Sequence, residues 1–112
     1  NHKMEYKNMG EFTRVFGTTP RNRVIEFFLE GRGADYSIGD LAEDTELNRA
    51  TAYNTMAELI KKGYIKPTRK VSGAQLYTIN TEKEEVKILI KVFNLLLKNI
   101  VEEYKKKEKV VA

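Results

Sequence analysis

The chain has 112 residues, of which 41% are hydrophobic and 32% charged, with a formal net charge of +4. This length fits one domain with one core, and the composition is typical of a folded protein with a strongly charged surface. The absence of cysteine excludes disulfides and thiol catalysis, and the only histidine is His2, near the N-terminus. No apolar stretch is long enough to span a bilayer. We therefore expect a cytoplasmic protein that is not an enzyme and holds no cofactor or metal ion.

The first two predicted helices lie before residue 31. Apolar residues recur at helical spacing over Met9–Phe16, and Gly17 ends the pattern. Thr19 is a suitable N-cap for the next helix, because Pro20 then takes the first helical position, where a missing N–H costs nothing. This helix is predicted to stop at Gly31 and to bury one stripe of residues, Val24, Ile25, Phe28 and Leu29.

Two further helices are predicted after residue 36. Ser37 and Asp40 have the spacing of a capping box, which opens a short helix. Asn48 is a suitable cap for the following helix, and Gly63 ends it. The residues predicted to face inward are Ile38, Leu41, Ala42, Ala52, Met56, Leu59 and Ile60.

A two-stranded hairpin is predicted next. Residues 64–67 and 75–79 have strand character, and Gly73 lies in the turn between them. Pro67 lacks a backbone donor, so its strand must be at an edge or bulged there. After the hairpin, Thr81 is expected to cap a helix from Glu82 to about Tyr104, and the lysine-rich tail is expected to fray.

Residues 48–65, Asn-Arg-Ala-Thr-Ala-Tyr-Asn-Thr-Met-Ala-Glu-Leu-Ile-Lys-Lys-Gly-Tyr-Ile, resemble the recognition helices of MarR, ArsR and related bacterial and archaeal regulators. Ile38–Ala42 is similar to the first helix of such a motif, and the resemblance covers residues 20–80. It implies a mainly α fold with a small β-hairpin, the winged helix-turn-helix. ArsR-type metal sensing needs Cys and His ligands that this chain lacks.

The resemblance also implies a function and a division of the chain. It indicates a sequence-specific regulator of transcription that binds double-stranded DNA, and we expect a repressor. Residues 1–17 would form an N-terminal arm, 18–80 the DNA-binding domain, and 81–112 a dimerisation helix with a charged tail.

Charge is segregated along the chain. Residues 35–46 contain five acidic residues and no basic one, whereas 48–78 contain six basic residues and one acid, Glu58. Such segregation favours an anionic partner, although a solvated face arising by chance is an alternative. Asp40, Glu43 and Asp44 share a helix face that could hold a hard cation, but a solvated acidic face is the preferred interpretation. The frequent Lys and Glu favour a thermophilic source.

The outward side of helix 48–62 carries residue types that read base edges. Arg49, Ala50, Tyr53 and Asn54 face away from the core positions and are predicted base contacts, since Arg pairs with guanine and Asn with adenine in the major groove. The hairpin is expected on the minor groove or the backbone. The predicted phosphate contacts are Thr51, Thr55, Lys61, Lys66, Arg69, Lys70 and Ser72.

The last helix is apolar over most of its circumference. Its polar side chains form one narrow stripe (Lys87, Lys91, Asn94 and Lys98), whereas a surface helix needs apolar residues over little more than a third of its surface. We therefore expect a homodimer and a palindromic operator, unless the N-terminal helix covers the excess. The predicted interface is Phe12, Phe16, Leu89, Phe93, Leu96, Leu97, Ile100 and Tyr104.

Three other interpretations remain open at this stage. The helix 48–62 could be an ordinary surface helix. A winged helix can also serve as a protein–protein adaptor, because one fold hosts many functions. An architectural or replication-related DNA-binding protein would share the basic surface without reading sequence.

Overall fold

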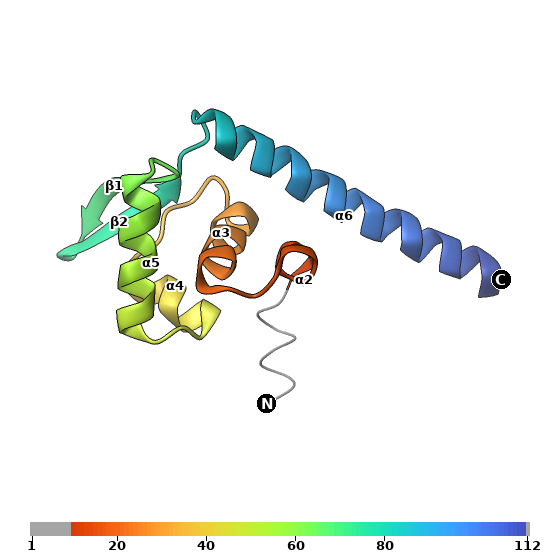
Figure 1. The fold of residues 1–112 in the computed structure, drawn as a ribbon, viewed down its shortest axis with the longest axis horizontal. Helices are drawn as coiled ribbons and strands as arrows, with labels where there is room; N and C mark the ends of the chain where they lie inside the picture. Colours follow the sequence, from red (N-terminus) through yellow and green to blue (C-terminus); the bar gives the residue numbers. More distant parts are fainter. Residues whose placement is uncertain (1–9, 112) are drawn as a thin grey trace.

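The structure is a computed structural model that describes residues 10–111 (Figure 1). His2 and Met9 therefore lie outside the described residues. The predicted fold class is confirmed: the chain is mainly α, with one antiparallel hairpin and a long final helix. The elements are α2 (Glu11–Phe16), α3 (Pro20–Glu30), α4 (Ile38–Thr45), α5 (Arg49–Lys61), β1 (Ile65–Val71), β2 (Ala74–Ile79) and α6 (Glu84–Val111).

Three helices begin where their capping residues predict. The side chains of Thr19, Ser37 and Asn48 each accept a backbone N–H from the first turn of α3, α4 and α5, at 3.2, 3.1 and 2.8 Å. Asp40 completes the capping box, because its carboxylate accepts the N–H of Ser37 at 3.3 Å. These caps satisfy N–H groups that a helix start otherwise leaves unpaired.

The core lies among α3, α4, α5 and the base of the hairpin, and one side of α6 closes it. The predicted stripes of α3 and α4 are buried, except that Ile38 is half-buried. In α5, Ile60 is also only half-buried, and Thr55 takes a buried position instead. The largest fully buried side chains include Phe28, Leu29, Leu41, Met56, Leu59, Ile65, Val24 and Val86.

The hairpin, called the wing below (residues 65–79), is longer than predicted because β1 continues to Val71. Its two-residue turn places Ser72 at φ 51° and Gly73 at φ 83°, the left-handed conformations that match the twist of a tight hairpin. Pro67 pairs with Tyr77 in a two-stranded sheet, so its strand is an edge strand, and the pairing becomes irregular between Pro67 and Lys70. Both observations agree with the prediction of an edge or bulged strand.

Helix α6 differs from the prediction at both ends. Thr81 is not its cap, since residues 81–83 form a turn and the helix starts at Glu84. Asn80 makes the joint instead: its side chain donates to the carbonyl of Gly63 at 3.0 Å and accepts the N–H of Glu82 at 3.2 Å. The helix runs through the tail that was expected to fray, because Lys and Glu are good helix formers.

Two polar contacts fix α2 and α6 to the rest of the chain. The buried carboxylate of Glu26 in α3 accepts the backbone N–H groups of Gly10 and Thr13, both at 2.9 Å, and so caps α2. Arg32, after α3, lies 5.6 Å from the centre of the Phe93 ring and donates to Asn94 at 3.4 Å. Neither contact is predicted from the sequence, since each joins residues far apart in the chain.

Candidate nucleic-acid interface

The first half of α5 presents four side chains on one exposed face. Arg49, Ala50, Tyr53 and Asn54 are all exposed, with Tyr53 at 51%, while Ala52 on the opposite side is fully buried. Tyrosine is enriched at interfaces, because its ring is apolar and its hydroxyl is polar. The four predicted base-contact residues therefore share one accessible face near the N-terminal end of α5.

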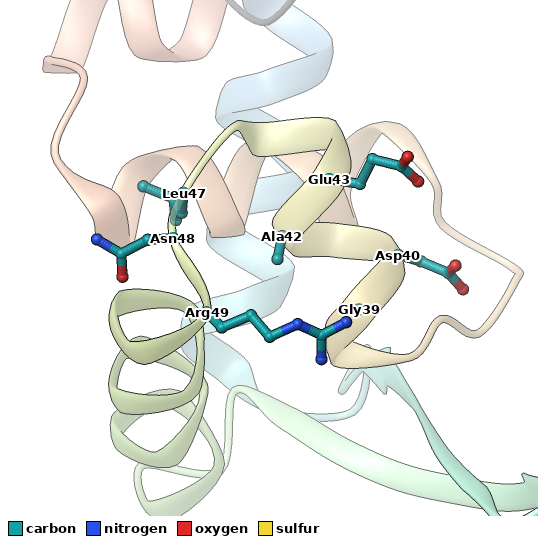
Figure 2. A pocket seen from close by; sticks show the side chains of 7 residues that line it. All are labelled: Gly39, Asp40, Ala42, Glu43, Leu47, Asn48 and Arg49. Atoms are coloured by element: carbon teal, nitrogen blue, oxygen red, sulfur yellow. The ribbon is translucent and has the colours of Figure 1, made fainter.

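Arg49 is directed across the start of α4. Figure 2 shows its side chain extending toward Gly39, where an added Cβ would lie 3.7 Å from Nη2. Asp40 and Glu43 project from the far side of α4 in the same view, and among residues 10–111 no carboxylate forms an ion pair with Arg49. The guanidinium thus keeps its charge and its donors for a partner.

A groove of about 380 Å³ separates α5 from the wing. Arg49 and Tyr53 line it on the helix side, and Gly73, Gln75 and Tyr77 line it on the wing side. Two of the four base-contact candidates and the wing therefore border one groove. The sequence predicted both parts, but not that Gln75 and Tyr77 would border the same groove.

Six of the seven predicted phosphate contacts differ in whether a ligand can reach them, and Arg69 is described separately below. Lys61, Lys66, Lys70 and Ser72 are exposed and Thr51 is half-buried, so these five can approach a ligand. Thr55 is a correction: it is buried, and its hydroxyl donates to the Thr51 carbonyl at 2.7 Å. A hydroxyl that is buried and paired within its own helix is not available to a phosphate.

Arg69 is engaged by Asp35 in the α3–α4 loop. The guanidinium donates from Nε to Oδ2 at 2.9 Å and from Nη2 to Oδ1 at 3.2 Å, and the Thr68 hydroxyl donates to Oδ2 at 2.7 Å. These hydrogen bonds, that of Arg69 first, lower the pKa of Asp35 to about 2. Arg69 therefore differs from the other predicted phosphate contacts.

Glu58, the one acid in the basic segment, is neutralised locally. It pairs with Arg21 at 2.9 Å and with Lys62 at 3.6 Å. The acidic side chain thus lies between two cations, and its charge opposes an anionic ligand less than the sequence suggests.

A second exposed surface lies along α6 and α2. Phe12 and Phe93 are corrections to the predicted dimer interface, because both are buried within one chain. Leu89 and Leu96 are half-buried against the core. The exposed apolar side chains are the predicted Phe16, Leu97, Ile100 and Tyr104 together with Val15, Ile88, Leu95 and Val101. Leu97, Ile100, Val101 and Tyr104 share one side of α6, called the apolar face below, whereas helical spacing puts Ile88 and Leu95 on the other side.

Helix α2 covers only part of α6. It contacts α6 and buries Phe12, yet side chains on the C-terminal half of α6 remain exposed, including Leu95 at 64% and Tyr104 at 65%. Large contiguous apolar patches are uncommon on monomers. The alternative that the N-terminal helix covers the whole apolar excess is therefore wrong.

Residues 10–111 were also compared with what a metal site and a membrane-spanning helix require. The described part of the chain holds no group of three or more His, Cys, Asp or Glu residues placed to bind a metal ion. Within residues 10–111, no helix combines the length and the apolar character needed to cross a bilayer.

Comparison with known proteins identifies this architecture. A family model described as the IclR helix-turn-helix domain matches residues 23–69, from α3 into the wing. The chain is a winged helix-turn-helix domain. No protein of curated function shows significant similarity in sequence.

Three solved structures show how far the winged helix-turn-helix likeness extends. The transcriptional regulator HlyU from Vibrio vulnificus is 23% identical, with a TM-score of 0.55 over 86% of this chain and 97% of that one. MepR from S. aureus, solved with a bound oligodeoxyribonucleotide, is 16% identical, with 0.58 over 97% and 84%. A domain of a possible ArsR-family regulator from Mycobacterium bovis, described as homodimeric, is 17% identical, with 0.55 over 83% and 81%. The resemblance predicted from residues 20–80 is confirmed for the fold.

Proposed function

We propose that this winged helix-turn-helix domain is a cytoplasmic, homodimeric repressor of transcription that binds double-stranded DNA with sequence preference. One observation carries the proposal: the start of α5 exposes Arg49, Tyr53 and Asn54, and the first two line a groove bordered by the wing. A helix of about this size fits the major groove, and its N-terminal residues reach the base edges. The bound oligodeoxyribonucleotide in the MepR structure supports the same use of the fold.

The exposed side chains suit direct readout. Arg49 can hold O6 and N7 of guanine with two hydrogen bonds, and Asn54 can pair with N6 and N7 of adenine. Ala50 and the Tyr53 ring offer apolar contact to a thymine methyl group. Lys66, Lys70 and Ser72 of the wing would contact phosphates flanking the minor groove, with Thr51 and Lys61 on phosphates beside α5.

The apolar face supports pairing with a second copy. Few charged side chains lie among its exposed apolar ones. Two-fold association with a second copy is the common way for a chain to cover such a surface. The homodimeric M. bovis domain supports the choice of a second copy over another partner. A dimer presents two α5 helices to a palindromic operator, with half-sites roughly one helical turn, about 34 Å, or a multiple of it apart.

Selection of bound sequences from random duplex DNA tests the proposal. A repressor of this kind yields an enriched, palindromic sequence. If no sequence is enriched and every duplex is bound in a salt-dependent way, the protein is an architectural DNA-binding protein. No binding to any duplex would leave the adaptor interpretation.

Substitutions in α5 test the assignment of the base contacts. Arg49→Ala and Asn54→Ala should each weaken binding to the selected site by about 1–3 kcal/mol and change binding to random DNA little. Lys91→Ala, on the polar stripe of α6, is the matched control for loss of a positive charge. Equal losses on selected and random duplexes would reassign Arg49 and Asn54 to phosphate contact.

A further inference from the structure

The wing carries three basic side chains, and one of them is held by the protein itself. Arg69 donates two hydrogen bonds to Asp35, which lies 34 residues earlier in the chain, whereas Lys66 and Lys70 make no ion pair with the side chains of residues 10–107. The pair Arg69–carboxylate has the two-bond geometry that Arg also uses to bind phosphate. Asp35 thus occupies two N–H donors of Arg69, Nε and Nη2, that a nucleic-acid phosphate would bind.

The bulge in β1 makes this contact possible. In a regular strand, Thr68 and Arg69 point to opposite faces, because successive side chains alternate. Here the pairing is irregular between Pro67 and Lys70, and both Thr68 and Arg69 donate to the same carboxylate. Gln75 of β2 donates to the Arg69 carbonyl at 3.0 Å, which binds the bulged backbone to its partner strand.

The two partners differ in freedom to move. The loop that carries Asp35 is fixed to the wing, since Tyr36 and Tyr77 exchange two backbone hydrogen bonds of 2.8 Å and Thr78 donates to the carbonyl of Ala34 at 2.9 Å. The Asp35 side chain is only 17% exposed, whereas that of Arg69 is 66% exposed. A phosphate can therefore reach Arg69 and draw it away, while the carboxylate stays in place.

We propose that Asp35 is a built-in competitor of DNA phosphate that holds Arg69 in the free protein and limits how strongly the wing binds duplexes of any sequence. The inference rests on the proposed DNA-binding function. A competitor of this kind acts on the non-specific, electrostatic part of binding, because phosphate contacts carry no sequence information. Base contacts from α5 then contribute a larger share of the total, and the preference for the operator over random DNA increases.

Asp35→Asn tests the proposal, with affinity for a random 20-base-pair duplex measured over a range of salt concentrations. Freeing Arg69 should raise the affinity about threefold to tenfold and steepen the salt dependence by roughly one unit. Glu43→Gln removes an equal charge from an exposed position without an ion pair in the described residues, and should change the affinity much less. Thermal unfolding followed by circular dichroism checks that every variant is folded.

A double substitution separates the specific contact from simple charge removal. In an Arg69→Gln background, Asp35→Asn should give no further gain, since the residue that it releases is absent. The proposal is overturned if Asp35→Asn binds random DNA no more tightly than the unchanged protein, or if its gain persists in the Arg69→Gln background. If neither the unchanged protein nor Asp35→Asn binds any duplex, the proposed DNA-binding function fails as well. Failure of the competitor role alone would leave DNA binding intact.

Discussion

Two regions of this chain solve the problem of burial differently. The head, which comprises α3, α4, α5 and the wing, encloses its large apolar side chains, and Phe28, Leu41 and Met56 are at most 1% exposed. The C-terminal half of α6 instead extends past α2 with its apolar face uncovered (Figure 1). The head thus carries its stabilising contacts within one chain, whereas α6 leaves apolar side chains exposed, which the second copy of the proposed dimer would cover. Folding and assembly should therefore respond to different substitutions.

The largest effect on folding is expected in the head. Phe28→Ala leaves a cavity in the core and should lower the free energy of unfolding by about 3–5 kcal/mol. Val71→Ala, at an exposed position near the tip of the wing, should change it by about 0.5 kcal/mol or less. Urea denaturation measures both. Similar losses for the two variants would contradict the assignment of the core to the head.

The largest effect on assembly is expected in α6. Leu97→Glu with Val101→Glu places charges on the apolar face and should weaken dimerisation at least a hundredfold, because burying an unpaired carboxylate costs several kcal/mol. The head should keep its unfolding temperature to within a few degrees. Leu96 is a poorer test site than the sequence suggested, since it packs against the core. Sedimentation measures the mass, which should fall from about twice 13.0 kDa to 13.0 kDa.

Lys98→Glu is the matched control for that experiment. It lowers the net charge by the same two units at an exposed position on the polar stripe of α6, and the dimer should persist. A 13.0 kDa species for the unchanged protein that still binds DNA tightly would contradict the role of the apolar face.

A smaller effect is expected where α2 joins the head. Glu26→Gln keeps the shape of the side chain but removes the charge that accepts the Gly10 and Thr13 N–H groups, and should cost about 1–3 kcal/mol. Hydrogen exchange at these two amides should accelerate. Its neighbour Glu30 provides the contrast, because burial and then the charges of Glu26 and Asp44 raise its pKa.

Removing the charge of Glu30 is expected to change the free energy of unfolding in the opposite direction. A carboxyl whose pKa is raised by folding stabilises most below its unfolded pKa, and this contribution is lost as the pH rises through the folded value. Glu30→Gln should therefore increase stability at neutral pH, where Glu26→Gln decreases it. A loss of stability in both variants at pH 7 would show that the two carboxyls share a structural role.

The smallest effect on stability is expected from the surface pair of Asp35 and Arg69. Since Arg69 lowers the pKa of Asp35 from 3.8 to about 2, the stabilisation is present above pH 3.8 and is lost as the pH falls toward 2. The carboxyl carbon of Asp35, followed by NMR, should titrate near pH 2 and return toward 3.8 in Arg69→Ala. A midpoint near 3.8 in the unchanged protein would show that the pair does not form in solution.

Local signals account for what the sequence predicted well. The caps at Ser37 and Asn48 depend on partners three residues away, and the edge position of the strand that contains Pro67 agrees with its missing donor. The contact of Arg69 with Asp35 spans 34 residues and depends on tertiary placement, so no pattern reveals it. Thr55 is a different case: it lies three residues after the buried Ala52, and helical spacing alone could have placed it in the core.

The length of α6 makes it a lever. Its 28 residues extend about 42 Å at 1.5 Å per residue, and the joint at Asn80 and the contact of Arg32 with Phe93 lie near its first half. A tilt of about 10° at that joint displaces the far end by roughly 7 Å. In a dimer held by the far half of α6, the same tilt changes the separation of the two α5 helices. If the proposed dimer binds two half-sites, the distance between them that it accepts should depend in part on Asn80 and Arg32, neither of which lines the groove beside α5.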